Sequence, residues 1–89
     1  MPTNDASSDI AYPELYETLR RWRSSKAFEE HKGAYMILSN ATLIAITNAL
    51  PTNATELCRL FGMGPARYKS YGADILEIVR DYIAENAQW

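Results

Sequence analysis

The side chains of this sequence that could perform catalysis are few and poorly spaced for it. The lone histidine, His31, stands beside Lys32 where a helix is expected to end, and a solvated cation is the simplest interpretation. Cys58 lies among apolar residues and is expected to be an inert thiol in or near the core. A single cysteine excludes an intrachain disulfide and a cysteine-based zinc site. We therefore expect no catalytic residue, no metal and no cofactor.

A glycine turn at residues 60–65 is the first candidate binding feature. Gly62 and Gly64 would let backbone N–H groups point outward at the start of a helix, an arrangement that can hold a phosphate. Arg67 stands where the dinucleotide-binding fingerprint needs a third glycine, so that motif fails. The alternative is a tight interhelical turn with Met63 in the core. In either case one of the two glycines is expected to have a positive φ.

Positive charge gathers in residues 19–32, which hold five bases and two acids. Leu15, Leu19 and Trp22 recur at helical spacing and are expected to face the core. That orientation leaves Arg20 and Arg23 on an exposed flank of the same helix. The block leads directly to the aromatic residue at position 35.

Basic side chains beside an aromatic ring suit single-stranded nucleic acid, because the cations meet phosphates and the ring stacks on a base. A second pair of bases flanks the glycine turn. The predicted nucleic-acid-binding residues are therefore Arg20, Arg23, Lys26, Lys32, Tyr35, Arg67 and Lys69. The alternative is that the arginines are ordinary solvated residues and that Tyr35 belongs to the core. For Tyr35 the sequence favours a buried ring with an exposed hydroxyl.

The elements that must position these residues are helices. Pro13 suits the first turn of a helix that Gly33 is expected to stop, and residues 34–38 are interpreted as an extended or irregular connector. Ser39 is a good N-cap for a second helix, which Pro51 ends.

Asn53 and Glu56 form a capping pair for a third, short helix whose apolar face is Leu57, Leu60 and Phe61. A fourth short helix is predicted from residue 65 to 71, with Gly72 as its left-handed cap. A last helix follows over about 73–85, and its acids are expected to form a solvated stripe opposite the core.

Length and charge limit the functional classes. The 89 residues, 47% hydrophobic and 22% charged, predict one globular domain at 11–86, with a disordered segment at 1–10 and a tail at 87–89. A net charge of −2 argues against tight nucleic-acid binding. No secretion signal or membrane-length apolar run is visible, so we expect an intracellular protein, in the bacterial cytoplasm and nucleoid or in a nucleus.

Several of these motifs, in this order, resemble the HRDC domain of RecQ-type helicases and RNase D. Leu15-Tyr16-x-x-Leu19-Arg20-x-Trp22-Arg23 is similar to the opening helix of that family, and residues 34–43 resemble its tyrosine-containing signature. The glycine turn, Lys69-x-Tyr71-Gly72 and the final apolar helix follow in register. Asn40 stands where the family usually has an acidic residue.

The resemblance implies an all-α, compact bundle of about five short helices, of the orthogonal SAM/HRDC type, that is not itself an enzyme. It implies an accessory module of a larger ATP-dependent DNA helicase, RecQ-type or related, or less readily of an RNase D-type nuclease. Such a module is expected to be monomeric and to contact single-stranded or branched DNA weakly. The alternative is a protein-interaction module whose acidic C-terminal helix docks on the parent motor or on another partner.

Overall fold

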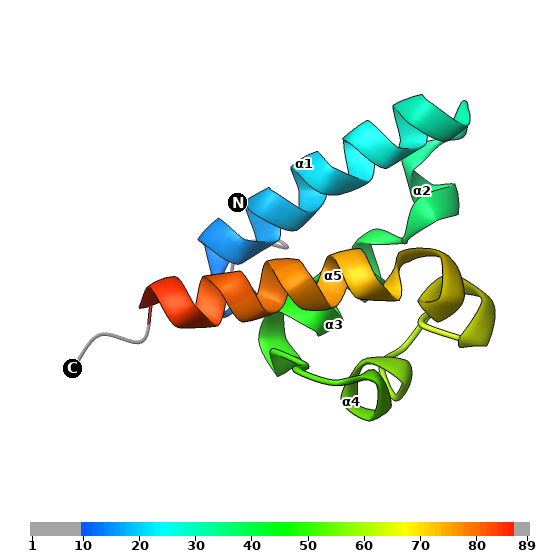
Figure 1. The fold of residues 1–89 in the computed structure, drawn as a ribbon. Helices are drawn as coiled ribbons and strands as arrows, with labels where there is room; N and C mark the ends of the chain where they lie inside the picture. Colours follow the sequence, from blue (N-terminus) through cyan, green and yellow to red (C-terminus); the bar gives the residue numbers. More distant parts are fainter. Residues whose placement is uncertain (1–9, 87–89) are drawn as a thin grey trace, which may run out of the picture.

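Five helices make up the computed structural model, which describes residues 10–86 (Figure 1). They are α1 (Pro13–Glu30), α2 (Ala34–Ile37), α3 (Asn40–Ala49), α4 (Ala54–Cys58) and α5 (Pro65–Asn86). No strand occurs within the described residues. The predicted all-α fold is therefore confirmed. The predictions for residues 1–9 and 87–89 lie outside the described residues.

The long helix α1 begins at Pro13 as predicted but ends earlier than predicted. His31, not Gly33, is its C-terminal cap, with left-handed backbone angles of φ 56° and ψ 47°. The N–H of Lys32 donates to the carbonyl of Ala27 at 2.9 Å, which closes the helix end in the manner of a Schellman motif.

Residues 34–38 are not a simple connector. Ala34–Ile37 form one helical turn, α2, and the backbone returns to an extended conformation at Leu38. Ile37 and Leu38 are both fully buried. The prediction of an extended or irregular segment was therefore wrong for residues 34–37, because burial of the second half of this apolar run folds its first half into a turn.

The two predicted N-caps are confirmed. Ser39 Oγ accepts a hydrogen bond from the N–H of Thr42 at 3.1 Å at the start of α3. Asn53 Oδ1 accepts from the N–H of Glu56 at 2.9 Å at the start of α4. The Glu56 carboxylate in turn accepts from the N–H of Thr52 at 2.8 Å. Both helices therefore start where local side-chain chemistry places them.

The C-terminal part of the chain contains one helix where two were predicted. Pro65 opens α5 as expected, but the helix continues through Gly72 to Asn86. Gly72 is buried, and a Cβ added to it would collide with the ring of Tyr68 one turn earlier. The glycine therefore makes room for an aromatic ring instead of ending the helix. The expected number of about five helices is right only because α2 replaces the helix lost at Gly72.

The core lies between α1, α3 and α5. Leu15 and Leu19 of α1 are fully buried, as predicted, and Trp22 is partly buried against the same cluster. Cys58 is exposed, so the prediction that it lies in or near the core was wrong. Among the described residues, the fully buried apolar side chains are Leu15, Leu19, Ile37, Leu38, Leu43, Ile46, Leu57, Met63, Ile75 and Val79.

The helices α1 and α5 are joined by polar contacts along their shared edge. The indole N–H of Trp22 donates to Asp74 at 3.2 Å, and the ring of Trp22 meets that of Tyr71 edge-on. The Tyr71 hydroxyl donates to Glu30 at 2.7 Å. Asp74 therefore faces α1, which corrects its assignment to the solvated stripe of the last helix.

Candidate nucleic-acid interface

Arg23 does not lie on an exposed flank, contrary to the prediction. Its residue exposure is 8%, and its Nη1 donates to the carbonyl of Leu38 and to Asn40 Oδ1, both at 2.9 Å. Burial lowers the pKa of the guanidinium, although an arginine stays charged. Arg23 therefore ties α1 to the segment that enters α3, and in this position it cannot meet a phosphate.

Two further bases of α1 are engaged by neighbouring acids. Arg20 is exposed and pairs with Glu17 at 2.7 Å, and this hydrogen bond lowers the pKa of Glu17 and raises that of Arg20. Lys26 lies 3.6 Å from both Glu29 and Asp74, with a side chain that is mostly covered. The middle of the basic block is thus largely neutralised by the protein itself.

Tyr35 is the most prominent aromatic side chain of the predicted set. It lies on α2 with 73% of its surface exposed, so the favoured prediction of a buried ring was wrong. Its ring passes over Gly33, where an added Cβ would approach the ring to 2.7 Å. The periodicity of the sequence could not show this exposure, because the outward face of α2 is set by burial of Ile37 and Leu38.

Three predicted bases lie near this end of the bundle. Arg67 donates from Nε to the carbonyl of Ile37 at 2.9 Å, and its Nη1 is 3.5 Å from the carbonyl of Gly62. Lys69 is exposed on the same helix, two residues further on. Lys32 precedes α2 and lies 3.3 Å from Glu30. The structure therefore joins Arg67 to the helix that carries Tyr35, with Lys32 three residues before that tyrosine, whereas Lys69 is an exposed residue of α5 and Arg20 lies in the middle of α1.

The glycine turn between α4 and α5 has the predicted strained backbone. Gly62 has a φ of 80°, and Met63 is buried, as the interhelical-turn interpretation expects. Phe61 was predicted to be part of the apolar face of the short helix, but it is 72% exposed. It lies beyond the end of α4 at Cys58, so it does not share a helical face with Leu57. The sequence carries no signal for its exposure apart from the glycine that follows it.

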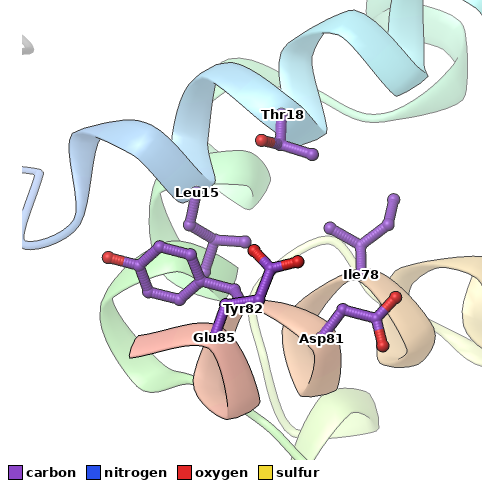
Figure 2. A pocket seen from close by; sticks show the side chains of 6 residues that line it. All are labelled: Leu15, Thr18, Ile78, Asp81, Tyr82 and Glu85. Atoms are coloured by element: carbon purple, nitrogen blue, oxygen red, sulfur yellow. The ribbon is translucent and has the colours of Figure 1, made fainter. Parts of the chain in front are cut away.

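The opposite end of the α1–α5 pair carries a shallow pocket of about 210 Å³. Figure 2 shows Leu15 and Thr18 of α1 on one side of it and the Glu85 carboxylate of α5 pointing into the space between the helices. Ile78, Asp81 and Tyr82 complete its lining. Leu15, Ile78 and Tyr82 form the apolar part of its wall, and its two charged side chains are acidic.

The fold and this geometry define a small helical domain with aromatic and basic side chains at one end. The chain belongs to the HRDC domain family, whose model matches residues 13–79. Among residues 10–86, no group of histidine, cysteine and carboxylate side chains could hold a metal ion. None of the helices described is long and apolar enough to cross a membrane.

Relatives and a structural neighbour agree with this assignment. The ATP-dependent DNA helicases UvrD2 of Mycobacterium bovis and Mycobacterium tuberculosis are 40% identical to this chain over 67 residues, which are 75% of this chain and 10% of the relatives. The chain therefore spans about a tenth of the length of these helicases. The third HRDC domain of D. radiodurans RecQ superposes with a TM-score of 0.75 at 29% identity, over 89% of this chain and 97% of that domain.

Proposed function

We propose that this HRDC domain is an accessory module of a larger ATP-dependent DNA helicase and contacts single-stranded or branched DNA weakly and without sequence preference. The observation that carries the proposal is the exposed ring of Tyr35 on α2, within a stretch of sequence, residues 31–55, that contains no acid. No acid occurs between Glu30 and Glu56 or between Glu56 and Asp74. The named helicase relatives support the parent class.

The expected chemistry is stacking assisted by charge. The Tyr35 ring would stack on an unpaired base, and the ammonium groups of Lys32 and Lys69 would meet flanking phosphates. Two or three phosphate contacts predict a slope of about −1.5 to −2 for log affinity against log salt. Because the net charge of the chain is −2, binding is expected to fade near physiological salt.

The test is fluorescence anisotropy with a labelled oligothymidine at low salt. Tyr35→Ala is expected to weaken binding about fivefold or more while leaving the melting temperature unchanged, because the ring is exposed. Lys69→Glu is expected to weaken binding and flatten the salt slope. Arg21→Glu is the matched control, since Arg21 is exposed on α1 away from α2. Equal losses for Lys69→Glu and Arg21→Glu, or no binding by the unmodified domain, would contradict the proposal.

A protein-docking role is the second candidate, and the pocket between α1 and α5 favours it. An apolar wall formed by Leu15, Ile78 and Tyr82 beside Asp81 would suit a lysine or arginine side chain of a partner. In a nuclear magnetic resonance titration with a helicase motor domain, this role predicts shifts at residues 78–85. Shifts restricted to α2 on adding DNA, with none on adding the motor, would contradict it.

A further inference from the structure

The turn between α4 and α5 displays a phenylalanine that its neighbours do not cover. Met63 is buried and Leu60 is packed against the core, yet Phe61 between them is 72% exposed. Exposure of most of an apolar ring of this size to water is energetically unfavourable. The same turn therefore anchors itself with two apolar side chains and directs the third outward.

The outward direction of Phe61 is fixed by the backbone around it. Thr42 Oγ1 donates to the carbonyl of Phe61 at 3.0 Å, which ties the turn to α3. Gly62 has a positive φ, and a Cβ at that position would collide with the Thr42 hydroxyl. The N–H of Met63 donates to the carbonyl of Leu60 at 3.1 Å and closes the turn. Phe61 is thus presented by a constrained segment.

Arg67 connects this turn to the helix that carries Tyr35. Its guanidinium contacts the carbonyl of Ile37, two residues after Tyr35, and the carbonyl of Gly62, one residue after Phe61. The segments that carry the two exposed rings, α2 and the turn between α4 and α5, are therefore both held by the Arg67 side chain. This role differs from the direct phosphate contact predicted for Arg67, because at least two of its nitrogens already face backbone carbonyls.

The charges around Phe61 favour a polyanion as its ligand. Residues 57–73 contain Arg59, Arg67 and Lys69 and no acidic residue. Arg59 is exposed at the end of α4, two residues before the ring. A phenyl ring has no hydrogen-bonding group, so it stacks on any base with little regard to sequence.

We propose that Phe61 is a second stacking residue for the same single strand, placed at a fixed spacing from Tyr35 by Arg67. This inference rests on the proposed function. It adds a second contact residue, Phe61, and gives Arg67 the role of holding the turn between α4 and α5 against α2. The ligand is an unpaired stretch of nucleotides long enough to reach both rings. The strand would run from α2 across Arg67 to the turn between α4 and α5.

The test compares two exposed phenylalanines in the oligothymidine assay. Phe61→Ala is expected to weaken binding about fivefold or more, whereas Phe28→Ala, at a residue 83% exposed on α1, is expected to leave affinity unchanged. Phe61→Trp is expected to retain or improve binding, because a larger ring still stacks. Circular dichroism melts of all three should match the unmodified domain.

The outcomes separate this inference from the proposed function. If Tyr35→Ala weakens binding while Phe61→Ala behaves like Phe28→Ala, the second stacking residue is refuted and the proposed function stands. If the unmodified domain does not bind the oligonucleotide at low salt, both are refuted. Equal weakening by Phe61→Ala and Phe28→Ala would indicate general apolar adhesion and would also overturn the inference.

Discussion

Arg23 is a buried cation whose contacts, within residues 10–86, are neutral. Its Nη1 is shared by the carbonyl of Leu38 and the amide of Asn40, and its Nε has no hydrogen-bond partner. A buried charge of this kind is costly unless an opposite charge compensates it. Asn40 occupies the position from which a carboxylate would do so, at the first residue of α3 where the helix dipole also favours an acid.

Asn40→Asp is therefore expected to stabilise the domain by about 1–2 kcal/mol at pH 7. Urea unfolding measures the change, and the gain should shrink below about pH 4 as the new carboxylate is protonated. Asn40→Ala is the control and should destabilise, because it removes an acceptor from Arg23. An aspartate variant no more stable than the parent would show that Arg23 is adequately satisfied by neutral groups.

The glycine turn offers a matched pair of substitutions at residue scale. Gly62→Ala is expected to cost about 2–3 kcal/mol, because the positive φ disfavours a side chain and the new Cβ would meet the Thr42 hydroxyl. Gly64→Ala should change stability by less than about 0.5 kcal/mol, since nothing lies within 4 Å of the added Cβ. Thermal melts of the two variants decide the matter, and equal melting temperatures would show that the turn relaxes.

At the scale of elements, one hydrogen bond between α1 and α5 depends on pH, because it needs an ionised Glu30 carboxylate and a protonated Tyr71 hydroxyl. The Tyr71 hydroxyl donates to Glu30, which lowers the pKa of Glu30 below its usual 4.5 and raises that of Tyr71 above its usual 10.0. A carboxylate whose pKa is lowered in the folded state stabilises the fold at neutral pH, and this stabilisation is lost as the pH falls through the lowered pKa. A phenol whose pKa is raised in the folded state also stabilises the fold, and this stabilisation is lost as the pH rises through the raised pKa.

Tyr71→Phe removes this hydrogen bond and keeps the ring. The difference in unfolding free energy between the parent and this variant should be constant between about pH 5 and pH 9 and should shrink beyond both limits. Urea titrations across the pH range measure it. A difference independent of pH would mean that the hydroxyl acts without Glu30. Lys26→Met, which leaves this hydrogen bond intact, controls for the nearby ion pairs.

The elements that were predicted correctly are those with local signals. Ser39 and Asn53 cap α3 and α4 through hydrogen bonds within three residues, so neighbouring sequence suffices to find them. Gly72 and the apolar run at 34–38 were misinterpreted because their conformations depend on contacts. The ring of Tyr68 decides the first, and burial of Ile37 and Leu38 decides the second.

At the scale of the whole molecule, the candidate interface could be predicted only in part. Tyr35 and Lys69 were proposed as contacts from residue type and neighbourhood, and both are exposed, although a buried ring was the favoured prediction for Tyr35. Arg23 was wrongly predicted to be exposed. Helical spacing shows on which side of α1 the residue lies, but it does not show that the segment at Leu38 and Asn40 packs against that side. Phe61 was missed as a surface residue because an apolar residue in a periodic run is ordinarily buried.

The two ends of the described chain lie side by side. Tyr12, just before α1, meets Tyr82 near the end of α5 with ring centroids 5.9 Å apart, and Figure 1 shows α2 and the start of α5 at the far side of the bundle. In a longer polypeptide, both linkers would leave from this one end and act as a single tether. A tether of a few tens of residues holds its cargo at an effective concentration near the millimolar range. If the domain binds DNA as proposed, an affinity that is weak in dilute solution would then be sufficient to keep its far end on a strand that another part of the polypeptide already binds.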